Sequence, residues 1–334
     1  MKKLSICIPT FNRGDFLKRL LVDILENERS HEVEIVISDN ASTDNTDEVV
    51  EFFKDKFSKL IYSKFDVNKG PDANFLQCVS LATSEYCWLM GSDDSISSGA
   101  IKQVLKNIEN SEPSVVLINI TECDYHLNKM RVHHWINEEE KTLFNTKIEN
   151  DLVEMFNAAN PLWGLFFGYI SSVVVKRSDW NSVSYNEKFN GTLFSFTSIV
   201  MQLIVRGCTL KSIREPVVLN RGYNDSMVAE LSGNQFARLV LDLDMYIVFS
   251  NMIPSLKVRE AYTNLARRNF GFYYILKIIL NSKKEEWVET REKFLSIGVS
   301  SNLLKIVEFL NLFKYAFKMM LIFRRKYLPR RRIF

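Results

Sequence analysis

The feature that most constrains the fold of this chain is the regular alternation of two apolar patterns across its first 120 residues. Short, continuous apolar runs are typical of buried strands, whereas apolar residues that recur every three or four positions predict helices. The expected strands are residues 4–8, 33–38, 60–64, 86–90 and 115–120, and the expected helices are residues 16–25, 49–57, 72–82 and 100–108. The alternation predicts an α/β fold in which helices cover both faces of a parallel sheet.

The pattern changes after residue 120 and divides the chain into three expected parts. The middle part mixes both kinds of element, with strands expected at residues 170–175 and 217–220 and a helix at 198–205. The last part reads as helices alone, expected at residues 236–249, 258–280, 285–295 and 303–323. Because no uncharged apolar run of about 18 residues occurs, we expect no transmembrane helix.

Composition and charge limit the class of protein. Of the 334 residues, 46% are apolar and 25% are charged, as in a folded globular protein. A net charge of +3 is too small for a dedicated nucleic-acid binder. The five cysteines are an odd set without a CxxC pair, which fits a reducing compartment. The apolar run at the N-terminus is too short for a signal peptide, so we expect a cytoplasmic protein.

Polar residues follow four of the expected strands at the point where each strand ends. In a parallel sheet these ends meet at one edge, which is where α/β proteins bind their ligands. Asp93 and Asp94 place two adjacent carboxylates there, and hard cations prefer carboxylate oxygens. Each segment alone could be a turn or a helix cap, including the acidic pair before residues 100–108. Four such segments at one edge indicate a shared crevice: residues 9–13, 38–44, 68–74 and 92–94.

These segments also carry a resemblance to a known family. The chain resembles the family 2 glycosyltransferases, and within them it is most similar to bacterial O-antigen sugar transferases of the abequosyltransferase type. The resemblance rests on residues 8–13, 38–44, 68–75, 86–94, 169–176 and 221–226. It implies a GT-A fold, a Rossmann-like mixed sheet with a helical C-terminal extension. The implied parts are a nucleotide-sugar-binding half (1–120), an acceptor-binding half (121–230) and a helical region (231–334).

The resemblance implies a role for each polar segment. The residues expected to bind the nucleotide sugar are Pro9, Thr10, Asn12, Arg13, Asp39, Asn40, Gly70, Asp72, Asn74, Ser92, Asp93, Arg221 and Ser226. Asp93 and Asp94 stand at the family's Asp-x-Asp element and would hold Mg²⁺ or Mn²⁺, with Asp94 as the more direct ligand. A divalent cation there would act as a Lewis acid on the departing diphosphate. The donor would be a UDP-, CDP- or dTDP-linked sugar.

The chain departs from the family at two places that matter for catalysis. Many relatives carry an acidic pair about a dozen residues before an Arg-Gly, but residues 192–197 contain no acid. The base that takes the proton of the acceptor hydroxyl must therefore come from elsewhere. Candidates are Asp124, Glu187 and Asp225, although an acid of this kind is more often a solvated surface residue than a base. At the second place, Tyr223 stands where relatives often have a histidine near the metal.

An aromatic-rich zone lies in the middle part of the chain. Sugars stack on aromatic faces, but packing in the core explains most clusters of this kind. We therefore expect core residues at Trp163, Phe166, Phe167, Tyr169 and Trp180.

The C-terminal segment is both apolar and basic. Residues 303–323 repeat polar side chains every three or four positions, which predicts a helix with a broad apolar face. Arginines and lysines then dominate residues 324–332. Such a helix could lie on an anionic membrane, or it could pack on the domain and leave a solvated basic tail. The resemblance favours the membrane, because an O-antigen acceptor is carried on a lipid.

Together the residues and the resemblance predict an inverting, metal-dependent glycosyltransferase. It would move a sugar to a lipid-carrier-linked oligosaccharide, at the cytoplasmic face of the inner membrane and without a nucleic-acid partner. One alternative is a nucleotidyltransferase acting on a sugar phosphate, although residues 9–13 lack a glycine-rich phosphate loop. The other is a non-catalytic, membrane-bound sugar-nucleotide-binding subunit, because the acidic base is missing from its usual place.

Overall fold

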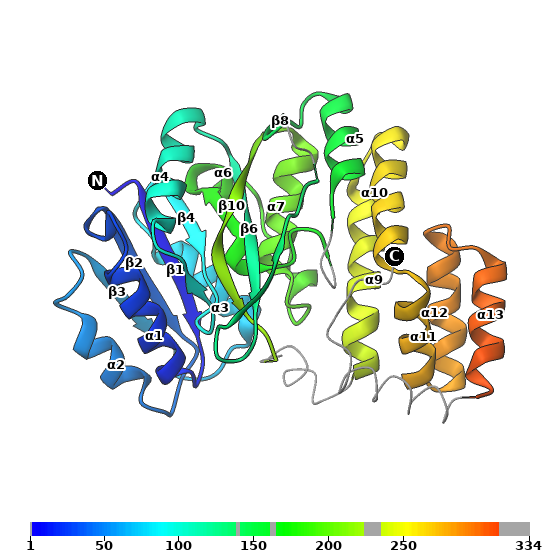
Figure 1. Ribbon diagram of the computed structural model, residues 1–334, viewed down its shortest axis with the longest axis horizontal. Coiled ribbons are helices and arrows are strands. Elements are labelled where there is room, and N and C mark those ends of the chain that lie inside the picture. The colour runs from blue at the N-terminus through cyan, green and yellow to red at the C-terminus, as the bar shows by residue number, and fades with distance from the viewer. Residues whose placement is uncertain (1, 138–140, 161–164, 224–234, 314–334) are drawn as a thin grey trace.

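The computed structural model describes residues 2–137, 141–160, 165–223 and 235–313. A sheet covered by helices stands beside a separate group of helices from the C-terminal part of the chain (Figure 1). Four strands from the N-terminal part are parallel to one another: β1 (Leu4–Thr10), β2 (Val33–Asp39), β3 (Leu60–Lys64) and β4 (Tyr86–Leu89). Every residue of β1 and β2 is buried, which explains why the sequence of these strands is almost continuously apolar.

The rest of the sheet is mixed. Its strands are β5 (Ser95–Ile96), β6 (Val115–Cys123), β7 (Lys129–His133), β8 (Leu143–Asn145), β9 (Val173–Lys176) and β10 (Thr209–Arg221). The order across the sheet is β3-β2-β1-β4-β9-β6-β10-β5, with β7 beside β6 and β8 beside β10. β9 is antiparallel to both β4 and β6, whereas β10 is parallel to β6.

The fully parallel sheet predicted from the alternation is therefore wrong beyond β4, and the mixed sheet implied by the resemblance is confirmed. The reason lies in where the chain enters β9. The hydroxyl of Ser171 accepts a hydrogen bond from the Gly91 N–H at the carboxyl end of β4 (2.9 Å). β9 follows directly from that point and runs back across the sheet, so its direction opposes that of β4.

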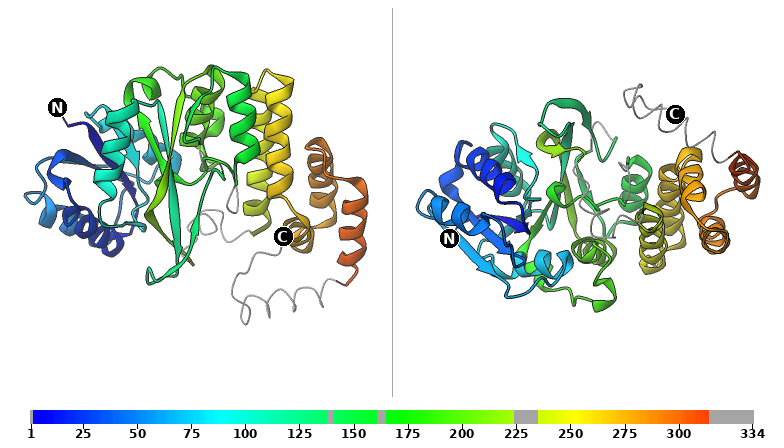
Figure 2. Two further views of the ribbon diagram at one scale, coloured as in Figure 1. Left: turned by 45° about the horizontal axis from the view of Figure 1, so that its top comes forward. Right: turned by 90° about the horizontal axis from the view of Figure 1, so that it is seen from below.

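Helices cover both faces of the sheet (Figure 2). One face carries α1 (Gly14–Leu25), α2 (Thr46–Phe53) and α4 (Ala100–Ser111), and the other carries α3 (Pro71–Leu81) and α7 (Ser195–Arg206). The chain runs outward from β1 to β3 and then returns to β4, and right-handed crossovers place α3 opposite α1 and α2. In α1, the helical spacing of Leu17, Leu20, Leu21 and Ile24 aligns four fully buried side chains. Each stabilises the fold by about 2 kcal/mol.

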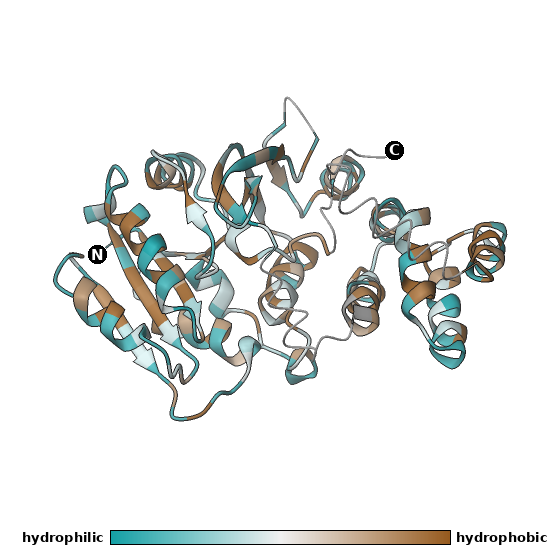
Figure 3. Cartoon of the chain, turned by 60° about the horizontal axis from the view of Figure 1, so that its bottom comes forward, coloured by the Kyte–Doolittle hydropathy of each residue, from teal (hydrophilic) through white to brown (hydrophobic). Residues whose placement is uncertain are grey.

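The helical part of the described chain consists of α9 (Gln235–Met252), α10 (Leu256–Asn269), α11 (Phe272–Asn281), α12 (Lys284–Ser296) and α13 (Ser301–Asn311). Two shorter helices, α5 (Glu149–Ala158) and α6 (Arg177–Asn181), lie beside the sheet. α10 packs against both α5 and α9 and so joins the helical part to the sheet. Figure 3 shows apolar and polar residues on different sides of these helices. None of the described helices combines the length and apolar character needed to cross a bilayer.

The single helix expected over residues 258–280 is wrong, because α10 and α11 are separate. Phe270 leaves helical geometry (φ −88°, ψ 61°) and Gly271 is extended (ψ 173°). Glycine disfavours a helix interior, and the turn lets the Phe270 ring pack edge-on against Tyr246 and Phe294. The helix expected over 303–323 is seen as α13 up to Asn311, residues 312 and 313 form a turn, and residues 314–323 lie outside the described residues.

Candidate active site

The strand register brings the polar segments to one edge of the sheet. Thr10, the last residue of β1, is directly opposite Asp39, the last residue of β2. β4 runs parallel on the other side of β1, with Cys7 opposite Leu89, so residues 92–94 follow at the same edge. The described segments therefore line one region, which the predicted crevice requires.

Asp94 is the most constrained acid in this region. It is 5% exposed, and one of its oxygens, Oδ2, accepts hydrogen bonds from the hydroxyls of Tyr169 (2.6 Å) and Ser171 (2.5 Å). The other oxygen, Oδ1, accepts from the Arg221 backbone N–H at 3.1 Å. Burial, and next the charge of Asp93, raise the pKa of Asp94 to about 7 against the opposing effect of these hydrogen bonds.

Asp93 is more accessible and faces a cation of the chain itself. Its Oδ1 lies 2.8 Å from a guanidinium nitrogen of Arg13, and its side chain is 14% exposed. Both carboxylates turn back over Gly91, where an added Cβ would lie 2.9 Å from an Asp94 oxygen and 3.2 Å from an Asp93 oxygen. A side chain at position 91 would therefore force the pair to move.

The pair fits a hard divalent cation held by two protein carboxylates. Its like charges raise the free energy of the ionised state, and a cation between them would lower it. Within the described residues, no group of three or more His, Cys, Asp or Glu side chains is placed to hold a metal. Mg²⁺ and Mn²⁺ would thus take their remaining ligands from other oxygens, as Mg²⁺ does when it keeps water and binds substrate phosphate.

Arg221 occupies a structural position. Its Nε donates to the backbone carbonyl of Asp93 (2.7 Å), and its Nη1 donates to the carbonyl of Tyr125 (2.5 Å). The guanidinium also lies over the Phe16 ring, 5.0 Å from its centroid. Arg221 is only 4% exposed and joins the end of β4, the β6–β7 turn and α1. Its expected role in holding phosphate stays a prediction, because two of its nitrogens donate to backbone oxygens here.

The loops after β1 and β2 hold each other through polar side chains. Asn12 has a left-handed backbone (φ 50°), its N–H donates to Ser42 Oγ, and its Oδ1 accepts from the Thr43 N–H, both at 2.8 Å. Asp39 is fully buried and accepts from the Ser42 N–H and the Tyr62 hydroxyl, also at 2.8 Å.

Asn40 joins this edge to the next loop. Its Nδ2 donates to Asn68 Oδ1 and its Oδ1 accepts from the Lys69 N–H, each at 2.8 Å. These contacts hold the loops at this edge together, and each polar atom involved already has a partner.

Two other residues at this edge have polar atoms without a partner. Thr10 and Asn74 are 2% and 3% exposed, and neither Thr10 Oγ1 nor Asn74 Oδ1 has a hydrogen-bond partner among the described residues. The Asn74 side-chain nitrogen donates to the Thr10 carbonyl (3.1 Å), so the two lie together. Buried polar atoms are nearly always paired, so this position favours a ligand or an ordered water that donates to both. Pro9 and Ser92, also expected at the site, are buried.

Asp72 lies at the N-terminus of α7. Its two oxygens accept from the N–H groups of Leu193 (2.9 Å) and Ser195 (3.0 Å), and it is 3% exposed. A carboxylate at a helix N-terminus binds free N–H groups and interacts favourably with the helix dipole. Asp72 thus caps the helix whose start lacks the acid that relatives carry. Gly70 precedes it with φ 83°, which glycine adopts without strain.

The candidates for the general base differ in how well they are placed. Glu187 is exposed on a short 3₁₀ turn. Both oxygens of Asp124 accept hydrogen bonds from Asn128 or the His126 N–H within the β6–β7 turn. Asp225 and Ser226 lie outside the described residues. The identity of the base therefore stays a prediction.

Tyr169 was expected only as a core residue, and the structure gives it a second role. It is partly exposed and packs against the core, and its hydroxyl donates to Asp94. Its ring stacks on Trp135 with centroids 6.2 Å apart. Burial and the charge of Asp94 raise the pKa of Tyr169 well above its usual value, so this hydroxyl keeps its proton. A tyrosine among phenylalanines was the available signal, because its hydroxyl needs a partner when buried.

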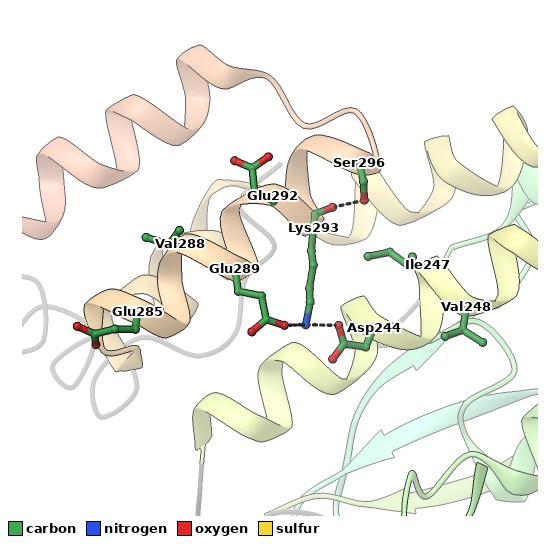
Figure 4. A pocket seen from close by; sticks show the side chains of 9 residues that line it. All are labelled: Asp244, Ile247, Val248, Glu285, Val288, Glu289, Glu292, Lys293 and Ser296. Atoms are coloured by element: carbon green, nitrogen blue, oxygen red, sulfur yellow. Dashed lines mark hydrogen bonds and ion pairs between the residues drawn. The ribbon is translucent and has the colours of Figure 1, made fainter. Parts of the chain in front are cut away.

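A groove outside this site lies in the helical part of the chain. It has a volume of about 720 Å³ and lies between α9 and α12 (Figure 4). Lys293 bridges Asp244 (2.8 Å) and Glu289 (2.9 Å) across it, and Ile247 and Val288 add apolar surface. None of its lining residues belongs to the polar strand ends.

Comparison with known proteins agrees with this geometry. The model of the family described as glycosyl transferase family 2 matches residues 5–173, from β1 to the start of β9. The chain belongs to this family. It is 31% identical over 324 residues to the abequosyltransferase RfbV of Salmonella typhimurium, covering 94% of this chain and 95% of that protein. It is therefore a glycosyltransferase, as the resemblance predicted.

Solved structures show the same architecture. Residues 1–349 of TarS from Staphylococcus aureus superpose with a TM-score of 0.63 at 16% identity, over 88% of this chain and 80% of that one. The complex of the same protein with UDP gives a TM-score of 0.63 at 17% identity, over 89% and 81%. Identities this low establish the fold alone, and they confirm the GT-A fold that the sequence predicted.

Proposed function

We propose that this glycosyltransferase is an inverting enzyme that transfers a sugar from a nucleoside diphosphate to a lipid-linked oligosaccharide of the O-antigen type. The observation that carries the proposal is the pair of adjacent carboxylates at the carboxyl edge of the sheet, formed by the buried Asp94 and the partly exposed Asp93. The similarity to an abequosyltransferase along nearly the whole chain supports the O-antigen type of product. A Campylobacter jejuni relative, 30% identical over 107 residues, is named as a glucosyltransferase acting on a PP-undecaprenol acceptor, which supports a lipid carrier.

The site residues suit departure of a nucleoside diphosphate. Asp93 and Asp94 would hold Mg²⁺ or Mn²⁺, which when bound supplies Lewis-acid stabilisation of the leaving diphosphate. Arg13, whose side chain is 21% exposed, is the guanidinium beside the pair that can reach phosphate oxygens. The unpaired oxygens of Thr10 and Asn74 would accept hydrogen bonds from the base or ribose of a UDP-, CDP- or dTDP-linked donor.

Inversion requires attack from the face opposite the diphosphate. The acceptor oxygen forms a bond to the anomeric carbon while the bond from that carbon to the phosphate oxygen breaks. The electron pair of the broken bond leaves with the nucleoside diphosphate, and the hydroxyl proton passes to a base of the chain. Glu187 and Asp225 are the acids proposed for this proton, since both oxygens of Asp124 already accept hydrogen bonds within the β6–β7 turn.

Attachment to the anionic inner face of the membrane is part of the proposal. On α13 and the turn that follows it, four large apolar side chains are more than half exposed: Ile306 (53%), Phe309 (60%), Leu312 (77%) and Phe313 (54%). The basic sequence of residues 324–332 follows this apolar surface. Apolar side chains inserted at the headgroup level and cations attracted to anionic lipid act together in peripheral attachment.

Family membership argues against the nucleotidyltransferase alternative, and one experiment separates an active enzyme from a non-catalytic subunit. The purified chain is screened with Mn²⁺ and UDP, CDP or dTDP for thermal stabilisation, and the sugar derivatives of the nucleotide that binds are then tested for nucleoside diphosphate release. We expect release that depends on metal and falls at least about 100-fold in Asp94→Ala and Asp93→Ala. Asp55→Ala, which changes an exposed acid on the surface, is the control. Turnover that survives both substitutions would remove the carboxylate pair from the mechanism.

A further inference from the structure

Asn220, the second-last residue of β10, has a buried polar atom that the proposed function does not yet use. Its Nδ2 donates to the Tyr169 hydroxyl at 2.9 Å. Its Oδ1 has no hydrogen-bond partner among the described residues, although Asn220 is only 8% exposed. An unpaired buried carbonyl is unfavourable unless a ligand or a water donates to it or binds it.

The orientation of the Asn220 amide follows from its neighbours. The Tyr169 hydroxyl has a single proton, which it donates to Asp94 Oδ2 (2.6 Å). Tyr169 must therefore accept from Asn220, and only the side-chain nitrogen of Asn220 can donate. The nitrogen is thus fixed toward Tyr169, and the carbonyl oxygen is the atom left without a partner.

The backbone places Asn220 on the other oxygen of the same carboxylate. The N–H of Arg221, in the peptide that follows Asn220, donates to Asp94 Oδ1 at 3.1 Å. The peptide between Asn220 and Arg221 thus contacts Asp94 Oδ1. The Asn220 side chain is linked to Asp94 Oδ2 through the Tyr169 hydroxyl. A single hydroxyl group, that of Tyr169, therefore separates the Asn220 amide from the Asp94 carboxylate.

Asn119 shows what a purely structural buried asparagine looks like in the same sheet. It lies on β6 and is 1% exposed. Its Oδ1 accepts from the Trp135 N–H (2.9 Å), and its Nδ2 donates to the Arg214 carbonyl (3.1 Å) and contacts the His134 ring nitrogen. Both ends of the Asn119 amide are paired, whereas only the nitrogen of Asn220 has a partner in the part of the chain that the structure describes.

We propose that the side-chain carbonyl of Asn220 is a third protein oxygen of the cation site formed by Asp93 and Asp94, acting on the cation directly or through one of its water ligands. Asparagine carbonyls are hard oxygen donors that suit Mg²⁺ and Mn²⁺. The site would then use a neutral oxygen to add a ligand without adding a third negative charge beside the two carboxylates. The proposal rests on the cation dependence of the proposed function.

Binding of Mn²⁺ alone to the purified full chain tests it, because this needs neither donor nor acceptor. We expect Asn220→Ala to bind Mn²⁺ about tenfold more weakly than the unchanged chain, measured by titration calorimetry and by the electron paramagnetic resonance of free Mn²⁺. Asn119→Ala, the matched control, should lower the melting temperature without changing Mn²⁺ affinity. Asp93→Ala should abolish Mn²⁺ binding.

A second variant keeps the test decisive where Asn220→Ala fails to fold. Asn220→Asp retains an oxygen and adds charge, so we expect Mn²⁺ to bind at least as tightly as to the unchanged chain and to raise the melting temperature further. Equal Mn²⁺ affinity in Asn220→Ala and Asn119→Ala, with binding lost in Asp93→Ala, overturns the role of Asn220 and leaves the cation site standing. Weaker binding in Asn220→Asp overturns it as well. Absence of Mn²⁺ binding to the unchanged chain overturns both the role of Asn220 and the metal dependence in the proposed function.

Discussion

The polar residues at the end of β2 differ from those around the ends of β4 and β10 in where their hydrogen bonds go. Both side-chain oxygens of Asp39 accept hydrogen bonds from neighbouring segments. Both ends of the Asn40 amide are also paired, with the loop after β3. Around β4 and β10, two like-charged carboxylates lie together and Asn220 keeps an unpaired oxygen. The residues after β2 stabilise the conformation of the loops. The residues around β4 and β10 keep a repulsion between carboxylates and an unpaired oxygen, and a bound ligand can relieve both. Residue type alone does not distinguish the two groups.

Paired substitutions at two buried aspartates give the largest expected contrast. Asp94→Asn removes a buried charge beside another carboxylate, so we expect donor turnover to fall at least about 100-fold while the unfolding free energy at pH 8 rises. Asp72→Asn leaves an amide that cannot accept from both the Leu193 and Ser195 N–H groups, so the unfolding free energy should fall by about 2 kcal/mol. Urea unfolding and nucleoside diphosphate release measure the two effects. If the unfolding free energy falls in both variants, Asp94 stabilises the fold as Asp72 does, and the expected contrast between the two aspartates is wrong.

The pH dependence of stability sharpens the same contrast. The pKa of Asp94 is raised to about 7 in the folded chain, against 3.8 for an ordinary aspartate. Between these values the folded chain keeps a proton that the unfolded chain has lost, so this contribution to stability is present at low pH and is lost as the pH rises through about 7. In metal-free buffer we expect the unfolding free energy of the unchanged chain, relative to Asp94→Asn, to fall between pH 4 and pH 7. A difference that stays constant over this range would mean that the carboxyl titrates normally.

A smaller effect is expected at the surface of α13, far along the chain from the site. Replacing both Phe309 and Leu312 by serine should weaken binding to phosphatidylglycerol vesicles about tenfold, because it removes apolar surface available to the bilayer. Leu256→Ser is the control, since Leu256 is 78% exposed at the start of α10. Deletion of residues 324–334 should weaken binding mainly at low salt. Vesicle sedimentation measures all three, and equal binding by every variant would contradict the proposed attachment.

The N-terminal strands could be predicted closely because their signal is local. The expected strand at residues 60–64 coincides with β3, and those at 4–8 and 33–38 each fall short at the carboxyl end, by two residues and one. The sequence did not predict β5, β7 or β8, which are short. β5 has two residues and pairs with β10, where Ser95 lies opposite Leu219, so no periodicity within the segment could reveal it.

The site shows the same division between local and distant information. The carboxylate pair stood out because its two members are adjacent and follow an apolar run. The contact of Tyr169 with Asp94 joins residues 75 apart, and the bond from Leu193 to Asp72 joins residues 121 apart. Such contacts depend on the packed sheet, so the sequence assigned Tyr169 to the core and Asp72 to the nucleotide loop. The free oxygen of Asn220 is likewise visible only once every neighbour is placed.

The ion pair between Arg13 and Asp93 has a thermodynamic consequence for how ligands arrive. A diphosphate that engages Arg13 removes the positive partner of Asp93, and a divalent cation that engages Asp93 frees Arg13 for phosphate. Each ligand therefore breaks the ion pair between Arg13 and Asp93, and this ion pair opposes binding of the other ligand. By thermodynamic linkage, the cation raises the affinity for the diphosphate by the same factor as the diphosphate raises the affinity for the cation. The cation and the donor would enter as cooperative ligands, coupled through a single guanidinium.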